Sequence, residues 1–175
     1  MVTDRQARDE MSESDVFNNE SGQQANTAQK LRSVHFPEDF SLGGLYAIYR
    51  TGNMSGWWED KLGEARGTVE VVADCNLHIL VNPRADLRAF NKLKANDIQS
   101  LAFRLCDIND NDLETISHLT GLRYLALSER HITDAGLASL RNLLYLHTLD
   151  LGGTLVSDYG LARLKHLGDL RKLYV

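Results

Sequence analysis

The sequence has no long apolar run, few cysteines and only a small excess of one charge. No stretch of its 175 residues approaches the roughly 18 to 20 apolar residues that a membrane span requires, so we expect neither a membrane protein nor a membrane partner. The two cysteines, Cys75 and Cys106, are too few for a disulfide framework or a four-ligand zinc site. Because the N-terminus also lacks the apolar stretch of a secretory signal, we expect a cytoplasmic protein.

A basic excess is missing too. The formal net charge is −5: residues 1–40 contain eight acidic and four basic residues, and the other 135 contain 16 and 15. A chain with no surplus of basic residues has little to neutralise phosphates with, so nucleic acid is not an expected partner.

Motifs of metal sites and of common enzyme classes are absent as well. The sequence contains no His-x-x-His or Cys-x-x-Cys spacing, no Gly-x-Ser-x-Gly elbow and no Walker-type loop. We therefore expect no metal, no cofactor and no enzymatic activity. A pair such as His147 with Asp150 leaves a hydrolase as an alternative.

The N-terminal region is polar and acidic. Residues 1–35 are predicted to be a disordered tail, because a stretch rich in Asp, Glu, Gln, Asn and Ser cannot bury enough apolar surface to order itself. Val16 and Phe17 form a bulky apolar pair within it. That pair either belongs to a solvated leader or forms a short recognition peptide.

Residues 36–82 have a different composition, with glycines separating short β-branched runs. These runs predict three strands, at residues 45–49, 68–72 and 77–81. We expect a small β-rich unit. Trp57 and Trp58 fall in the loop between the first two runs, where they either close a small core or stack on a ligand such as a sugar.

From Ile98 onward the chain repeats every 24 residues. Apolar residues occupy the same seven positions of each row over three full rows, which chance does not explain. The columns are Ile98, Leu122, Leu146 and Leu170; Leu101, Leu125, Leu149 and Leu173; Phe103, Leu127, Leu151 and Val175; Ile108, Ile132 and Val156; Leu113, Leu137 and Leu161; Ile116, Leu140 and Leu164; Leu119, Leu143 and Leu167.

The spacing within a row predicts its local structure. The first three columns alternate with polar positions, as in a strand with one buried face, and the last three lie at intervals of three, as on one stripe of a helix. No row can bury its apolar face without a neighbour, so the rows must stack. Polar residues that can accept free amide hydrogens begin each helix: Asp110, Asp112, Thr133, Asp134, Ser157 and Asp158.

The repeat resembles a known family. The segments Leu122-Arg-Tyr-Leu125-Ala-Leu127 and Leu146-His-Thr-Leu149-Asp-Leu151 are similar to the strand motif of leucine-rich repeats. Ile132-Thr-Asp-Ala-Gly-Leu137 and Val156-Ser-Asp-Tyr-Gly-Leu161 resemble the second half of a 24-residue bacterial subclass. The match covers residues 98–175, and Asp74, Leu77 and Ile79 lie 24 residues before Ile98, Leu101 and Phe103.

The resemblance implies an α/β fold, a right-handed leucine-rich repeat solenoid with parallel strands on the concave face and short helices on the convex face. Residues 83–175 would form the repeats, as three full rows from residue 98 and a final strand, and residues 36–82 would form the N-terminal cap. In the ninth column, where the family places a side chain that bonds turn backbone, the sequence has Cys106, Arg130 and Thr154. This implies a structural role for Cys106, whereas Arg130 departs from the pattern.

In the family, side chains that alternate with the buried leucines bind partners on the concave face. The resemblance implies the binding residues Arg104, Tyr124, Ser128, Thr148, Asp150, Lys172 and Tyr174. Ser100, Ala102, Ala126 and Gly152 share that face, as does His78 one turn earlier. We expect a non-catalytic protein-protein interaction module that binds a protein partner, with Tyr124 as its best anchor. The alternative is a structural fragment of a longer or truncated array with no binding activity of its own.

The last expectation concerns residues 170–175, a fourth strand that no helix follows. An uncovered strand edge presents unpaired amide and carbonyl groups. The isolated chain should therefore either fray from about residue 168 or pair end to end with a second copy.

Overall fold

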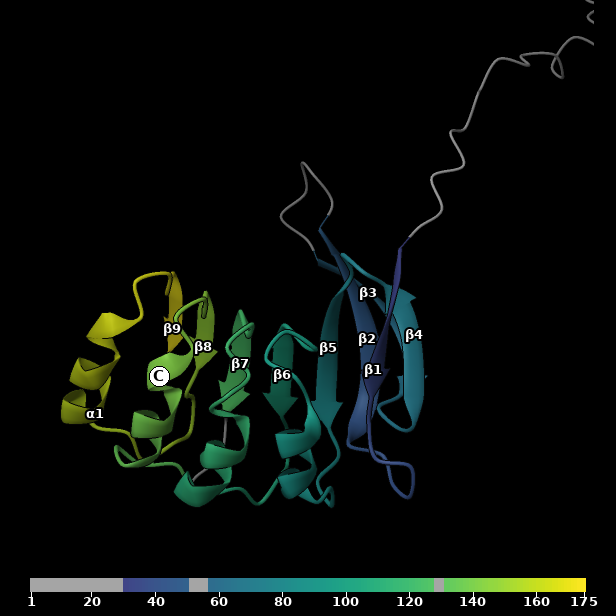
Figure 1. Ribbon diagram of the computed structural model, residues 1–175. Helices are drawn as coiled ribbons and strands as arrows, with labels where there is room; N and C mark the ends of the chain where they lie inside the picture. The colour runs from purple at the N-terminus through teal and green to yellow at the C-terminus, as the bar shows by residue number, and fades with distance from the viewer. Residues whose placement is uncertain (1–29, 51–56, 128–130) are drawn as a thin grey trace, which may run out of the picture.

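Seven strands form the main sheet of the protein (Figure 1). The structure, a computed structural model, describes residues 30–50, 57–127 and 131–175, so most of the predicted acidic tail lies outside the described residues. The strand order is β3-β2-β5-β6-β7-β8-β9. The bounds are Gly43–Arg50 for β2, Trp57–Glu64 for β3, Asn76–Val81 for β5, Ser100–Phe103 for β6, Tyr124–Leu127 for β7, Thr148–Asp150 for β8 and Lys172–Tyr174 for β9.

The sheet is antiparallel at one end and parallel over the rest. β2 pairs antiparallel with both β3 and β5, and every pairing from β5 to β9 is parallel. Leu101 pairs with Leu125, Leu125 with Leu149 and Leu149 with Leu173, each partner 24 residues further along the chain. The predicted parallel pairing of the strands near residues 100, 124 and 148 is therefore confirmed.

The first parallel pairing departs from the predicted register. Ile79 pairs with Leu101, and Val81 pairs with Phe103, so the offset is 22 residues and not the predicted 24. Because both offsets are even, the same side chains still face the core. The irregularity belongs to the connection between β5 and β6, which carries the short helix Leu87–Lys92.

The β-rich part contains five strands, two more than the sequence predicts. Strands form at all three predicted places, as β2, β5 and β4, which spans Thr68–Val72. The assignment of residues 31–35 to the tail is wrong, because Leu31–His35 forms β1, which pairs antiparallel with β4 and buries Val34. Trp57 and Trp58 begin β3 and do not lie in a loop, and their side chains are outside the description.

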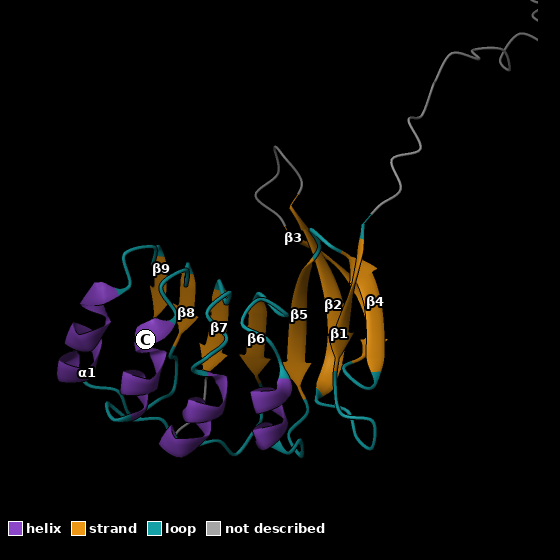
Figure 2. Ribbon diagram, in the orientation of Figure 1, coloured by secondary structure: helices purple, strands orange, loops and turns teal. Residues whose placement is uncertain are grey.

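Short helices cover one face of the parallel strands (Figure 2). They are the 3₁₀ helices η1 (Leu87–Lys92), η2 (Asp110–Ile116), η3 (Gly136–Asn142) and η4 (Arg163–His166), and the α-helix α1 (Asp158–Ala162). The interval of three between the apolar columns suits a helix with 3.0 residues per turn, because side chains at i and i+3 then lie on one line. In the described part of the chain, no helix is long and apolar enough to cross a membrane.

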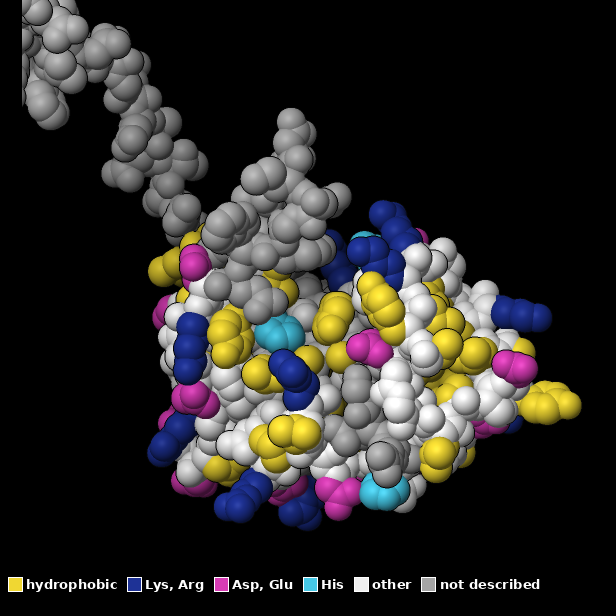
Figure 3. Space-filling view, turned by 180° about the vertical axis from the view of Figure 1, so that it is seen from behind, with side chains coloured by type: hydrophobic (Ala, Val, Ile, Leu, Met, Phe, Trp, Pro, Cys, Tyr) yellow, Lys and Arg dark blue, Asp and Glu magenta, His cyan; other side chains and the backbone are white. Residues whose placement is uncertain are grey.

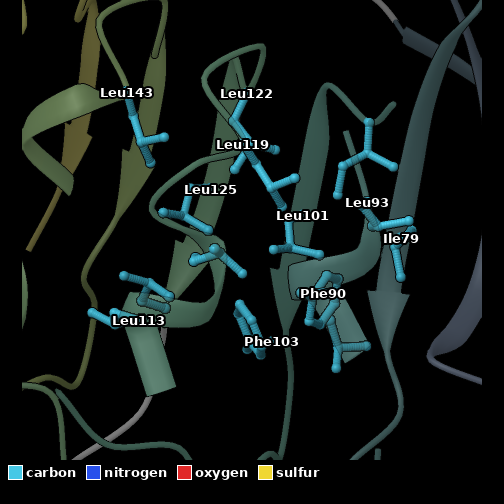
Figure 4. Packing of buried hydrophobic residues seen from close by; sticks show 14 of the residues in the cluster. Ile79, Phe90, Leu93, Leu101, Phe103, Leu113, Leu119, Leu122, Leu125 and Leu143 are labelled. Carbon is cyan, nitrogen blue, oxygen red and sulfur yellow. The ribbon is translucent and has the colours of Figure 1, made fainter. Parts of the chain in front are cut away.

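The core lies between these helices and the sheet (Figure 4). Val34 of β1 and Val71 of β4 extend it at the antiparallel end (Figure 1). Phe90 and Leu113 come from helices and pack toward Leu101, Phe103 and Leu125 of the strands. Burial weakens in the last row. There Val156, Leu161 and Leu170 are only partly buried, and Leu173 and Val175 are exposed.

Polar side chains tie successive rows together. The Asp110 carboxylate accepts the backbone N–H of Thr133 at 2.8 Å and its hydroxyl at 2.6 Å. Asp134 accepts the same two groups of Ser157, at 2.7 and 2.6 Å. The sequence predicts only caps within one helix, such as the Ser157 hydroxyl that accepts Tyr159 N–H. The two aspartates therefore bridge rows, a role that local spacing does not reveal.

The ninth column supports the turns as the resemblance implies. Cys106 is buried, and its thiol lies 3.7 Å from the Val81 carbonyl oxygen of the preceding turn and 3.6 Å from that of Arg104. The Thr154 hydroxyl donates to the Leu151 carbonyl at 2.7 Å. Arg130 lies outside the described residues.

Candidate binding face

The face of the sheet opposite the helices carries one continuous line of side chains. We call it the open face, formed by Tyr46, His78, Ser100, Arg104, Tyr124, Thr148, Asp150, Lys172 and Tyr174. Tyr46 pairs with His78, and the pairing continues without a break through Ser100, Tyr124 and Thr148 to Lys172. Because side chains alternate between the two faces of each strand, these six residues cross the sheet beside one another.

The open face is hollowed. Its residues line an open hollow of about 620 Å³, together with Ile48, Asn76, Leu80, Gln99, Ala102 and Arg123. Figure 3 shows this side of the molecule, where hydrophobic side chains gather over the middle of the sheet and charged side chains lie among them. The size falls in the range of ligand sites, but the hollow is open to solvent along the sheet and not enclosed.

A hydrogen-bonded pair forms the floor of the hollow. His78 Nδ1 lies 2.7 Å from Ser100 Oγ, and both side chains are buried. The Tyr46 ring lies on one side of the imidazole, with ring centroids 5.8 Å apart, and the Tyr124 ring meets it edge-on at 6.5 Å. The centre is thus an aromatic platform, in which the two tyrosine rings pack against the imidazole of a hydrogen-bonded His78–Ser100 pair.

Charged side chains surround this platform. Arg104, Arg123 and Lys172 are exposed, whereas Asp150 is partly buried and accepts the Gly152 N–H at 2.9 Å. Hydrogen bonding already uses one Asp150 oxygen. Three cations against one carboxylate give the lining of the hollow a net positive charge.

A second hollow continues the first. It has a volume of about 560 Å³ and shares Ala102, Arg104, Tyr124 and Asp150 with its neighbour. Leu105 lies at its rim, 90% exposed and with a φ of 57°, in the left-handed region. A leucine rarely adopts this conformation, because the left-handed region costs free energy for a residue with a Cβ. Leu105 thus adds an exposed apolar side chain to the hollow that the sequence does not predict.

The structure brings six of the seven sequence-predicted binding residues onto this face. They are Arg104, Tyr124, Thr148, Asp150, Lys172 and Tyr174. Ser128 lies outside the described residues. Tyr46 and Arg123 are missed by the repeat pattern, since Tyr46 comes from the antiparallel part and Arg123 directly precedes the strand core. The pairing of Tyr46 with His78 depends on a register between β2 and β5 that no repeat period encodes.

Three of the other histidines contact turns and helices. His118 Nε2 lies 3.0 Å from the Leu93 carbonyl oxygen, His131 Nδ1 lies 3.0 Å from Asp107 Oδ1, and His166 Nδ1 lies 2.7 Å from the Arg163 carbonyl oxygen. In the ranges that the structure describes, no three His, Cys, Asp or Glu side chains lie close enough to hold a metal ion.

Comparison with known proteins adds no assignment to this geometry. No protein-family model matches the chain, and no curated protein matches it significantly.

Proposed function

We propose that this chain is a non-catalytic, cytoplasmic leucine-rich repeat protein, a right-handed solenoid with a β-rich N-terminal cap, and that it binds a protein partner through the open face. The 24-residue offset of the parallel strands from β6 to β9 supports the repeat assignment. The burial of equivalent leucines in successive rows supports it further, with Leu101, Leu125 and Leu149 fully buried.

One observation carries the binding proposal: three tyrosines and three exposed cations surround a hollow on a sheet face that the helices leave uncovered. Tyr124 is 37% exposed and Tyr174 53%. Rigid amphipathic rings contribute contact area at low cost in conformational entropy, and Tyr and Arg dominate binding energy at protein interfaces. An open, elongated hollow suits a peptide segment or loop better than a small molecule, which would need burial on most sides.

The test uses the full chain as bait for protein capture, followed by titration of the purified partner. Tyr124→Ala and Arg104→Ala should each weaken binding at least about tenfold, the effect of a typical interface anchor. Tyr159→Ala is the matched control, because Tyr159 is 85% exposed on α1, away from the open face. The proposal would be overturned if Tyr124→Ala and Arg104→Ala left the affinity unchanged. It would also be overturned if Tyr159→Ala weakened binding as much as they do.

The Ser100–His78 pair favours a second candidate, a serine hydrolase. A serine within hydrogen-bond reach of a histidine is the arrangement that activates a hydroxyl nucleophile. The test is covalent labelling by a fluorophosphonate. Labelling that Ser100→Ala and His78→Ala abolish would support this candidate, and an unlabelled Ser100 would exclude it.

A further inference from the structure

The open face is positively charged in an acidic protein. Its hollow is lined by Arg104, Arg123 and Lys172 against Asp150 alone, a net charge of +2 where the whole chain has −5. Among the described residues, none of these three side chains forms an ion pair. A hollow of this sign attracts acidic ligands and repels basic ones.

A groove leads from the start of the described chain into this hollow. It is lined by Arg32, Cys75, Asn76, Gln99 and Arg123, among others, and the last three of these also line the open-face hollow. Arg32 follows Lys30, the first described residue, by two positions. The Arg32 guanidinium is anchored at this place by hydrogen bonds to the carbonyl oxygens of Cys75 and Asp97, at 3.2 and 3.1 Å. The chain that precedes β1 thus joins the molecule beside the groove.

That preceding chain contains a ligand of the matching chemistry. Residues 9–20 carry five acidic residues and no basic one, and the apolar pair Val16 and Phe17 lies among them. Position 20 and Lys30 are ten positions apart, an extended reach of about 33 Å. Neighbouring strands lie about 4.8 Å apart, so the distance from β5 to β8 is only about 14 Å. The tether is long enough for the segment to lie across the hollow.

We propose, building on the proposed function, that residues 9–20 bind the open face of their own chain and compete with the protein partner. Val16 and Phe17 pack against Tyr46 and Tyr124, while the flanking carboxylates neutralise the cations of the hollow. A tethered ligand acts at an effective concentration of about 1 mM, so even a segment that binds with a Kd of about 100 µM covers the face most of the time. The partner that displaces it shares its chemistry, an acidic segment with an apolar pair.

The test measures binding of a fluorescein-labelled synthetic peptide of residues 9–20 to the full chain and to the full chain with Val16→Ser and Phe17→Ser. The two serine substitutions remove the tethered competitor. They should lower the Kd of the peptide about tenfold, which is the ratio of the effective concentration to the Kd of the tethered segment given above. Asn18→Ser with Asn19→Ser is the matched control, which changes neighbouring residues without removing apolar surface, and should bind as the unchanged chain does. Adding Arg104→Ala and Lys172→Ala to the Val16/Phe17 variant should weaken the binding again, and melting curves verify that every variant is folded.

Each other outcome overturns the inference. Equal peptide affinity for the two chains would show that residues 9–20 do not cover the face in cis. No binding to either chain would show that the face does not take this segment. A difference that changes with protein concentration would place the segment on a second copy. Tyr124-dependent capture of a partner is measured separately, so the proposed function can stand when this inference fails.

Discussion

At the scale of single residues, Asp134 shows how one carboxylate connects two rows. It accepts the Ser157 hydroxyl and backbone N–H, and these hydrogen bonds lower the pKa of Asp134 below its ordinary value. Asp110 makes the equivalent contacts with Thr133 one row earlier. Asp158, in the next row, makes no hydrogen bond through its side chain in the described part of the chain. An aspartate at this position of the repeat thus bridges to the following row in two cases, Asp110 and Asp134, and among the described residues makes no such bridge as Asp158.

Asp134→Asn should lower the melting temperature at neutral pH, because an amide cannot accept from both Ser157 donors with two oxygens. A carboxyl whose pKa is lower in the folded state stabilises the protein above its unfolded pKa of about 4, and this contribution is lost as the pH falls through the folded pKa. The melting difference between the unchanged chain and Asp134→Asn should therefore shrink below about pH 4. Asp158→Asn is the control, and an equal effect of both substitutions at neutral pH would contradict the bridge.

Gly160 leaves room for this bridge. A Cβ placed there would collide with Asp134 Oδ1 and would lie 2.8 Å from Asp134 Cγ and 3.0 Å from Val156 Cγ1. Gly to Ala within a helix ordinarily stabilises by up to about 1 kcal/mol, but here the carboxylate would have to leave Ser157. We expect Gly160→Ala to destabilise by about 1 to 3 kcal/mol. Gly168→Ala, where a Cβ meets nothing within 4 Å, should be nearly neutral. Chemical denaturation measures both, and a stabilising Gly160→Ala would disprove the contact.

At the scale of elements, each short strand separates a core face from the open face. In β8, Leu149 is fully buried, whereas its neighbour Thr148 lines the open-face hollow. Leu149→Ala should cost about 2 to 5 kcal/mol, because the core loses a buried side chain and keeps a cavity, and Leu125→Ala should cost a similar amount. Thr148→Ala should cost well under 1 kcal/mol. Equal losses on urea unfolding would contradict the assignment of the two faces.

The elements also show what the sequence can and cannot predict. The parallel strands follow from the period itself, because leucines 24 residues apart must stack to be buried. β3 is unpredictable from local pattern, since its charged sequence, with Glu59, Asp60, Lys61 and Glu64, becomes a strand through antiparallel pairing with β2. β1 escapes prediction for the same reason, as Val34 is its only fully buried residue and the strand forms through antiparallel pairing with β4.

The same limit applies to the candidate binding face. Tyr124, Thr148 and Lys172 could be assigned to one face because they share a column of the repeat. Tyr46 could not, because strand β2 reaches the same line only after pairing with β5 in the opposite direction. The left-handed backbone conformation of Leu105 arises from the turn, and no neighbouring residue in the sequence predicts a positive φ there.

At the scale of the whole molecule, the two ends of the sheet differ. Both are edge strands with one neighbour, but β3 pairs antiparallel with β2, whereas β9 pairs parallel with β8 and belongs to residues 171–175, which are all exposed. Hydrogen exchange should show fast amides at Leu173 to Val175 in a monomer, or protection there that disappears on dilution if two copies pair through this edge. A monomer at all concentrations with a protected final strand would contradict this expectation.

The tyrosines report most directly on the central claim, that the open face binds the partner. Tyr124 and Tyr174 line the hollow, whereas Tyr159 is exposed on α1. The measurement is hydroxyl-radical footprinting of the chain with Val16→Ser and Phe17→Ser, so that its own segment does not contribute, with and without the captured partner. The account predicts reduced oxidation of Tyr124 and Tyr174 and unchanged oxidation of Tyr159 in the complex. Protection of Tyr159 with Tyr124 and Tyr174 unchanged would place the partner on another surface and contradict the account.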